Sequence, residues 1–67
     1  MNPDNATPLY IRLDRSRMII AYWLEDRVTG YSLQELVPGI GWCLASSRKG
    51  WKQNEIDTAI HRHITGE

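Results

Sequence analysis

Hydrophobic and polar side chains alternate strictly from Leu9 to Asp14, which is the period of a strand with one buried face. The next apolar stretch, 18–24, is hydrophobic at odd and even positions alike, and it predicts a central strand covered on both faces. The polar segment 14–17 between them predicts a turn, because aspartate is favoured at the first turn position. Residues 1–8, rich in proline and polar side chains, are expected to form a flexible tail.

The middle of the chain has two interpretations. Residues 25–30 predict a turn, with Gly30 taking a positive φ. Residues 31–37 alternate like a strand, but Ser32 followed by Glu35 could instead cap a helical turn. We favour the strand and leave the helical turn open.

A tight turn is predicted at Pro38-Gly39, because proline sets one φ and glycine accepts a positive one. Residues 42–46 then predict a short strand, in which Trp42 and Leu44 share one face. A core this small needs its large side chains, so Trp42 is expected to pack inside.

The last segment changes to the period of an amphipathic helix, with either Asn54 or Ser47 as the amino-terminal cap and Gly66 as its end. The sequence therefore predicts an α+β fold, with a single domain over 9–66. A small antiparallel sheet of three or four strands carries one C-terminal amphipathic helix packed on one face. The strand order stays open. The apolar helix positions are Ile56, Ala59, Ile60, His63 and Ile64.

The chain is small for an unaided core. It has 67 residues, no Phe, three Trp and three Tyr, and short chains bury a smaller share of their surface than long ones. A second copy or a bound partner could supply missing burial, so we expect a monomer or a homodimer. The amino end lacks the basic and apolar regions of a secretion signal, and no apolar run is long enough to cross a membrane. A cytoplasmic protein without a membrane partner is expected.

Catalytic chemistry has few candidates. Cys43 with His61 or His63 is the one conceivable nucleophile pair, and the apolar neighbours of Cys43 favour a buried packing thiol. Residues two apart on a helix point about 200° away from each other, so the histidines cannot share a metal. His63 is expected to pack on the apolar face and His61 to face water. We expect no enzyme activity, no metal and no cofactor.

Charge is balanced overall but uneven along the chain, with net charge zero. A protein that binds the phosphate backbone is usually basic overall, because its affinity comes from counterion release. Patches of both signs suit a charged protein surface at least as well. The candidate acidic contacts are Glu25, Asp26, Glu35, Glu55 and Asp57, and the candidate basic-turn contacts are Arg15, Arg17, Arg48, Lys49 and Lys52, with Trp51 among them.

Trp51 has two interpretations. It lies between Lys49 and Lys52, where the last strand gives way to the helix. It is either a lid packed over the end of the sheet or an exposed aromatic anchor for a partner. The sequence leaves both open.

Three short motifs carry a resemblance to the amino-terminal arm-binding domain of phage tyrosine recombinases. These are Leu9-Tyr10-Ile11-Arg12, then Tyr22-Trp23, then 26–30, followed by the carboxy-terminal helix. The resemblance implies a three-stranded sheet backed by a helix and laid in the DNA major groove. The neutral charge and the insertion at 32–40 depart from that family. The implied DNA contacts are Arg12, Arg15, Arg17, Arg48, Lys49 and Lys52.

In kind only, the chain also resembles the small inhibitors that phages deploy against host defence, anti-CRISPR proteins among them. This resemblance implies a host effector protein or nucleoprotein complex as partner. The acidic contacts would compete for arginines that hold DNA phosphate. We expect a non-enzymatic protein-binding inhibitor, with a DNA-binding β-sheet module of a phage or mobile-element protein as the alternative. A toxin-type nuclease ranks last.

Overall fold

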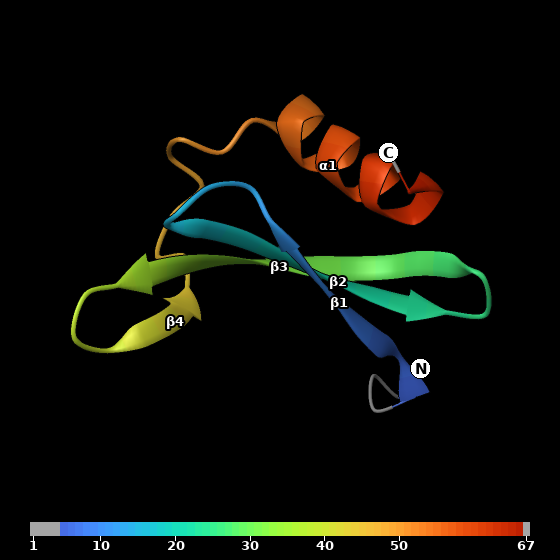
Figure 1. The fold of residues 1–67 in the computed structure, drawn as a ribbon, viewed down its shortest axis with the longest axis horizontal. Helices are drawn as coiled ribbons and strands as arrows, with labels where there is room; N and C mark the ends of the chain where they lie inside the picture. Colours follow the sequence, from blue (N-terminus) through green and yellow to red (C-terminus); the bar gives the residue numbers. More distant parts are fainter. Residues whose placement is uncertain (1–4, 67) are drawn as a thin grey trace.

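The chain folds as a four-stranded antiparallel sheet crossed by one helix. The computed structural model describes residues 5–66. Within them the strand order is β1-β2-β3-β4 and α1 lies across one face of the sheet, as Figure 1 shows. The predicted α+β class is confirmed. Among residues 5–66, no helix is long and apolar enough to cross a membrane. The elements are β1 (Thr7–Arg12), β2 (Arg17–Leu24), β3 (Arg27–Val37), β4 (Gly41–Leu44) and α1 (Gln53–Thr65).

The β1–β2 turn is held by one aspartate. Asp14 Oδ1 accepts hydrogen bonds from the backbone N–H groups of Ser16 at 2.9 Å and Arg17 at 2.8 Å. This is the local bonding that makes aspartate a turn residue, and it confirms the predicted turn. β1 begins at Thr7, two residues before the predicted start, while residues 1–4 of the expected tail lie outside the described part of the chain.

The β2–β3 turn is shorter than the sequence predicts. It consists of Glu25 and Asp26, whose φ values are 51° and 67°, and β3 begins at the next residue. Two consecutive positive φ values match the twist of a two-residue hairpin. The expectation of a positive φ at Gly30 was wrong, because Gly30 is already paired with Tyr22 inside the sheet.

β3 settles the uncertain middle segment as a strand of 11 residues. Its pairing with β2 shifts by one residue, since Gly30 pairs with Tyr22 whereas Val28 pairs with Trp23. A bulge of this kind changes which side chains share a face. It lets Val28 and Tyr31, three residues apart, both pack against the core beneath α1.

The core lies between the sheet and α1. Only one alternating set of β2 side chains, including Ile19 and Ala21, enters it. On the other face of β2, Met18 is 8% exposed, but Ile20 and Tyr22 are only half-buried, so the expectation that residues 18–24 are covered on both faces was wrong beyond Met18. The reason is that one helix covers one face. The buried cluster is Ile11, Ile19, Ala21, Leu33, Trp51 and Ile56.

Trp42 and Trp51 have different environments. Trp51 is 7% exposed and belongs to the core cluster. Trp42 is only half-buried, because pairing of Cys43 with Glu35 turns Cys43 toward α1 and Trp42 away from it. The expectation that Trp42 packs in the core was therefore wrong.

The ends of α1 differ from each other. The amino-terminal cap is Lys52, which makes no side-chain capping bond, so the expected caps Asn54 and Ser47 were wrong. Ser47 Oγ instead accepts a bond from Lys49 N at 3.2 Å within the preceding loop. Gly66 ends the helix as predicted, with φ 81° and its N–H bonded to a carbonyl one turn earlier.

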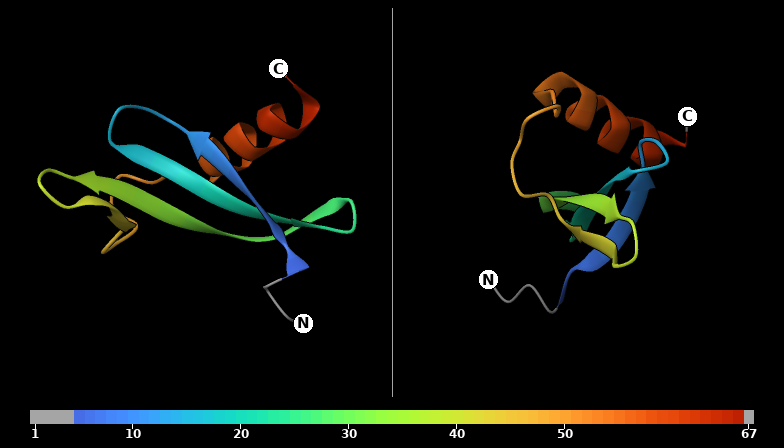
Figure 2. Two further views of the ribbon diagram at one scale, coloured as in Figure 1. Left: turned by 60° about the horizontal axis from the view of Figure 1, so that its bottom comes forward. Right: turned by 90° about the vertical axis from the view of Figure 1, so that its left-hand side faces the viewer.

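The last turn of α1 is more exposed than the middle of the helix. His63 is exposed, contrary to the expected packing, and Ile64 is 43% exposed. Contact with the sheet is made earlier, by Ile56 and the partly buried Ile60. Figure 2 shows α1 on one side of the sheet in both views.

Candidate functional site

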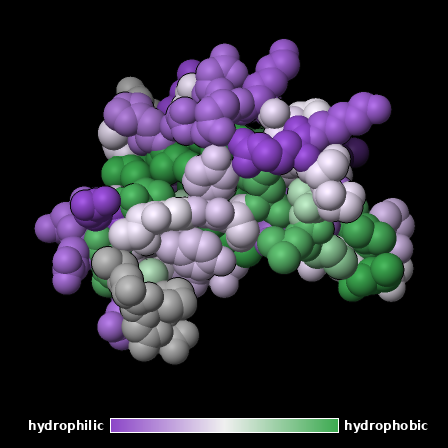
Figure 3. Space-filling view, turned by 180° about the vertical axis from the view of Figure 1, so that it is seen from behind, coloured by the Kyte–Doolittle hydropathy of each residue, from purple (hydrophilic) through white to green (hydrophobic). Residues whose placement is uncertain are grey.

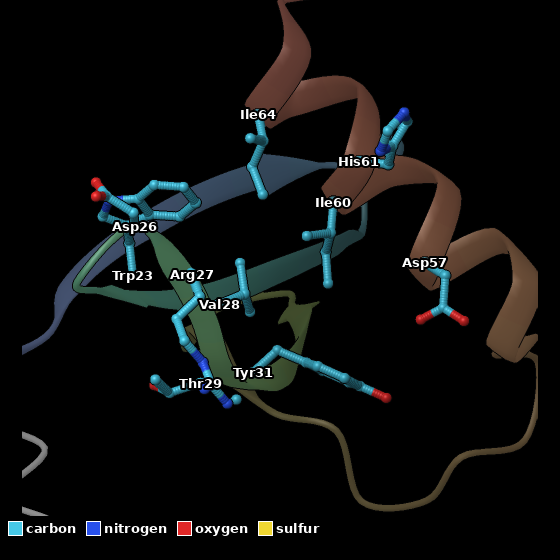
Figure 4. A pocket seen from close by; sticks show the side chains of 11 residues that line it. Trp23, Asp26, Arg27, Val28, Thr29, Tyr31, Asp57, Ile60, His61 and Ile64 are labelled. Atoms are coloured by element: carbon cyan, nitrogen blue, oxygen red, sulfur yellow. The ribbon is translucent and has the colours of Figure 1, made fainter.

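An open groove lies between the β2–β3 hairpin and α1. Its volume is about 520 Å³. Figure 4 shows its side chains converging from the hairpin on one side and the helix on the other. The groove is lined by Trp23, Asp26, Arg27, Val28, Thr29, Gly30, Tyr31, Asp57, Ile60, His61 and Ile64.

Local structure explains how the groove forms. On the helix wall, Asp57, Ile60 and Ile64 follow one face at intervals of three and four residues. On the sheet wall, the bulge holds Val28 and Tyr31 on the helix side. A regular strand would point these two side chains to opposite faces. The groove therefore depends on the register shift as well as on the helix.

A hydrogen-bonded chain fixes the Tyr31 end of the groove. Gln53 Nε2 donates to the Tyr31 hydroxyl at 3.1 Å and to Asp57 Oδ1 at 3.0 Å, and Arg48 Nη2 donates to Gln53 Oε1 at 2.8 Å. The guanidinium of Arg48 lowers the pKa of Tyr31, and the bond with Gln53 acts in the same direction. Asp57 is thus held at the rim in a defined orientation.

Two carboxylates, Asp26 and Asp57, stand on different walls of the groove. Arg27 also contributes to the lining, but it pairs with Leu24, whose side chain belongs to the opposite face of the sheet. In Figure 4 the Arg27 side chain runs beside Thr29, away from the helix. The groove interior is therefore aromatic and aliphatic, with anionic groups at two points of its rim.

The expected acidic surface is divided. Glu25 and Asp26 form the hairpin tip, and Asp57 faces the same groove as Asp26. Glu35 and Glu55 are used inside the molecule: Glu35 Oε1 accepts from Trp51 Nε1 at 3.4 Å, and Glu55 Oε1 accepts from Arg17 Nη1 at 3.0 Å. Only part of the predicted set remains available to a partner.

Arg17 joins the two basic turns. Its Nε donates to Asp14 Oδ2 at 2.8 Å, and its Nη1 donates to the Gly50 carbonyl at 2.9 Å. Its guanidinium also lies 5.2 Å from the Trp51 ring centroid. The pKa of Arg17 is raised, mainly by the bond to Asp14. The turn containing Arg15 therefore lies beside the 48–50 loop, and Arg17 itself is fully engaged within the fold.

The other predicted basic contacts have mixed roles. Arg15, Lys49 and Lys52 are exposed. Arg48 is exposed as well, but it contributes to the Gln53 network. Trp51, left open by the sequence, is buried beneath Arg17 and does not form an exposed anchor on the single chain.

The candidate nucleophile residues do not come together. Cys43 is half-buried on β4, with its Sγ 3.7 Å from the Gly41 carbonyl oxygen. His61 and His63 lie on the carboxyl half of α1, which Figure 1 shows at the other end of the molecule from β4. In residues 5–66, no three His, Cys, Asp or Glu side chains form a cluster able to hold a metal ion.

Sequence reasoning missed the aromatic and aliphatic walls of the groove. The spacing of Asp57, Ile60 and Ile64 places them on one helix face and was visible in the sequence. Trp23 and Tyr31 carried no comparable signal, because their convergence depends on the bulge.

Comparisons with protein-family models, curated proteins and solved structures gave no match to this chain.

Proposed function

We propose that the chain is a non-enzymatic protein-binding domain that receives an arginine side chain of a partner protein in the groove between the β2–β3 hairpin and α1. The observation that carries the proposal is the pair Asp26 and Asp57 on different walls of one aromatic groove. An arginine offers a planar cation with five donors, which suits carboxylates and aromatic faces together.

The size of the groove supports a side chain as occupant. Its 520 Å³ lies within the range of about 300–1,000 Å³ typical of small-ligand sites. Trp23 and Tyr31 provide ring faces, over which a guanidinium gains about 0.5–1 kcal/mol at an exposed site. Because Figure 4 places Asp26 and Asp57 at opposite ends of the groove, either carboxylate would orient the cation, and the aliphatic lining would contact its methylene stem.

An inhibitor of a host DNA-binding effector is the more specific form of this proposal. The captured arginine would be one that otherwise holds a DNA phosphate, as expected for an anti-CRISPR-like protein. Glu35 is bonded to Trp51 and Glu55 to Arg17, so neither is available to the captured arginine. The acidic contacts of the inhibitor would therefore be Asp26, Asp57 and the neighbouring Glu25.

The DNA-binding alternative receives less support from the positions of the cations. A sheet laid in the major groove would use its helix-free face, where Arg12 lies 5.2 Å over the Trp42 ring. Arg17 is engaged by Asp14, Gly50 and Glu55. Among the described residues, the exposed cations Arg15, Lys49 and Lys52 lie in the turn and loop regions outside the strands. A salt titration with random duplex DNA tests this: a log–log slope of about −4 to −6 would favour the DNA module.

The direct test is an NMR titration with the capped tripeptide acetyl-Gly-Arg-Gly-amide. The matched ligand is the same peptide with citrulline, which keeps the shape and loses the charge. We expect the arginine peptide to shift the Trp23 indole resonance and the amides near Asp26 and Asp57, with the citrulline peptide binding at least about tenfold more weakly, or about 1.4 kcal/mol.

The variant test pairs Asp26→Asn and Asp57→Asn with Glu25→Gln. Glu25 adjoins Asp26 but does not line the groove. The first two substitutions together should reduce arginine-peptide affinity about tenfold or more, whereas Glu25→Gln should change it less than about threefold. Equal binding of both peptides, or equal effects of all three substitutions, would contradict the proposal.

A further inference from the structure

β1 is an edge strand of the sheet, with β2 as its single neighbour in the strand order. Leu13 N donates to Arg17 O at 3.0 Å, and antiparallel strands alternate between residues that exchange hydrogen bonds and residues that do not. Ile11, two residues from Leu13, therefore bonds to β2 in the same way. The backbone N–H and C=O groups of Tyr10 and Arg12 point outward from the sheet.

Pro8 fits this alternation, because it lies two positions before Tyr10 and is outward-facing as well. It can accept a hydrogen bond there but has no N–H group to donate. Pairing along this edge is therefore fullest at Tyr10 and Arg12. Unpaired edge groups of this kind are the sites at which an extended peptide adds to a sheet.

Two hollows lie beside this edge, between β1 and the carboxyl half of α1. Figure 3 shows hydrophobic side chains exposed below the polar outer surface of α1, so one helix does not cover the full width of the sheet. The apolar hollow has a volume of about 260 Å³ and is lined by Leu9, Trp23, His63 and Ile64. The cationic hollow has a volume of about 320 Å³ and is lined by Ile11, Arg12, Leu13, Ala59, Arg62 and His63.

The two hollows have the spacing of alternate strand residues. Leu9 lines one and Ile11 the other, and both side chains pack on the helix side of the sheet. Residues two apart on a strand are separated by about 6.6 Å. An added strand has the same rise, so alternate side chains of a peptide paired with β1 would enter the two hollows together.

The cationic hollow lacks a counter-charge. Arg62 and His63 are exposed in the last turn of α1, and among the described residues no carboxylate lines this hollow. The ion pairs within residues 5–66 are made by Arg17, so Arg62 takes part in none of them. Arg12 contributes to the lining, while its guanidinium lies over the Trp42 ring on the other face. A partner carboxylate placed here would form charge-assisted hydrogen bonds with Arg62.

We propose that the β1 edge binds an extended acidic segment of a partner protein, which adds to the sheet as an antiparallel strand. A glutamate opposite Ile11 enters the cationic hollow, and a leucine opposite Leu9 enters the apolar hollow. In the antiparallel direction this is the order Glu-x-Leu, in which x pairs with Tyr10. Every strand pair of this sheet is antiparallel, and antiparallel pairing is slightly more stable per residue than parallel pairing.

A second copy of β1 fits this edge less well than an acidic segment. The strand reads TPLYIR and contains no Asp or Glu. Its charged side chain is Arg12, so two-fold pairing of β1 with β1 would leave the cationic hollow without a counter-charge. The chemistry of the hollow therefore favours a different chain as the occupant.

The test is an NMR titration of the full chain with the peptide acetyl-Ser-Thr-Glu-Val-Leu-Thr-Ser-amide. One matched peptide replaces its Glu by Gln, and the other exchanges the positions of Glu and Leu. In the protein, Arg62→Gln removes the cation of the hollow. Arg15→Gln is the matched control, because Arg15 is exposed in the β1–β2 turn and lines neither hollow.

We expect the Glu-x-Leu peptide to bind at least about tenfold more tightly than either matched peptide. Arg62→Gln should reduce the preference for Glu over Gln to less than about threefold, whereas Arg15→Gln should leave it unchanged. At saturation, hydrogen exchange of the Tyr10 and Arg12 amides should slow at least about tenfold. The Ile11 amide, which already bonds to β2, should change little.

Three results would overturn the proposal. The first is equal binding of the three peptides, and the second is binding without slower exchange at Tyr10 and Arg12. The third is exchange at Tyr10 that slows with protein concentration in the absence of peptide, which would assign the edge to a second copy. Trp23 and Ile64 line both the arginine groove and the apolar hollow, so the Tyr10 amide is the reporter here. Failure of the arginine-peptide titration leaves this readout unchanged, and the two proposals fail separately.

Discussion

Replacing Trp51 by alanine should cost far more stability than replacing Trp42. Trp51 is 7% exposed, lies in the core cluster, donates to Glu35 at 3.4 Å and carries Arg17 over its ring at 5.2 Å. Trp42 is half-buried on the sheet face opposite α1, with Arg12 over it. The substitutions Trp51→Ala and Trp42→Ala remove the same side chain from two different environments, so their losses of stability can be compared directly.

The magnitude follows from the burial. Truncating a buried tryptophan to alanine costs about 3–5 kcal/mol. A domain of 67 residues has a total stability of about 3–10 kcal/mol. Trp51→Ala therefore removes a third or more of the stability and brings the fold close to its limit. Trp42→Ala should cost about 1 kcal/mol in the single chain, because much of its ring is already in contact with water.

The assay is urea unfolding followed by far-ultraviolet circular dichroism, in which the backbone signal remains after an indole is deleted. Measurements at low micromolar concentration keep self-association from contributing to stability. Trp51→Phe serves as a second variant that retains a ring in the core, and it should lose less than half as much as Trp51→Ala. A loss below about 1 kcal/mol for Trp51→Ala, or equal losses at positions 42 and 51, would refute the assignment of Trp51 to the core and of Trp42 to the sheet face opposite α1.

Three further predictions concern the turns. Arg17→Lys should lose about 2 kcal/mol and speed amide hydrogen exchange in α1, because lysine cannot bond to Asp14, Gly50 and Glu55 together. Bonds from Arg17 lower the pKa of Asp14 from 3.8 to about 2, so its contribution to stability should be complete above about pH 4 and disappear toward pH 2; melting of Asp14→Asn should lack that part of the pH dependence. The double change Glu25→Asn with Asp26→Gly should raise the melting temperature by about 4–8 °C, because Asn-Gly suits two positive φ values; an unchanged melting temperature would contradict relief of strain.

The sequence by itself determined the local structure. The alternation in β1, the turns at Asp14 and Pro38-Gly39 and the end of α1 at Gly66 were all predicted and observed. Each depends on bonds or backbone preferences within a few residues, which the neighbouring amino acids specify. The choice of strand over helical turn for 31–37 succeeded for the same reason.

The amino-terminal cap of α1 was an exception among local features. Lys52 occupies the cap position although Asn54 and Ser47 have the preferred side chains. The contact of Arg17 with the Gly50 carbonyl and with Glu55 fixes the preceding loop and the first turn from the β1–β2 side. A long-range contact here overrides a local preference worth only about 1 kcal/mol.

Only the tertiary structure decided which face of the sheet is covered. Alternation assigns Trp42 and Cys43 to opposite faces, but both faces of β2 are hydrophobic, so the pattern does not say which one receives the helix. The groove depends on a register shift between Tyr22 and Trp23, beside Gly30 within β3. Gly30 in a strand is compatible with such a bulge but does not fix its register. Strand periodicity is a property of each segment, whereas coverage and register arise from pairing between segments, and this is why the core tryptophan proved to be Trp51 and not Trp42.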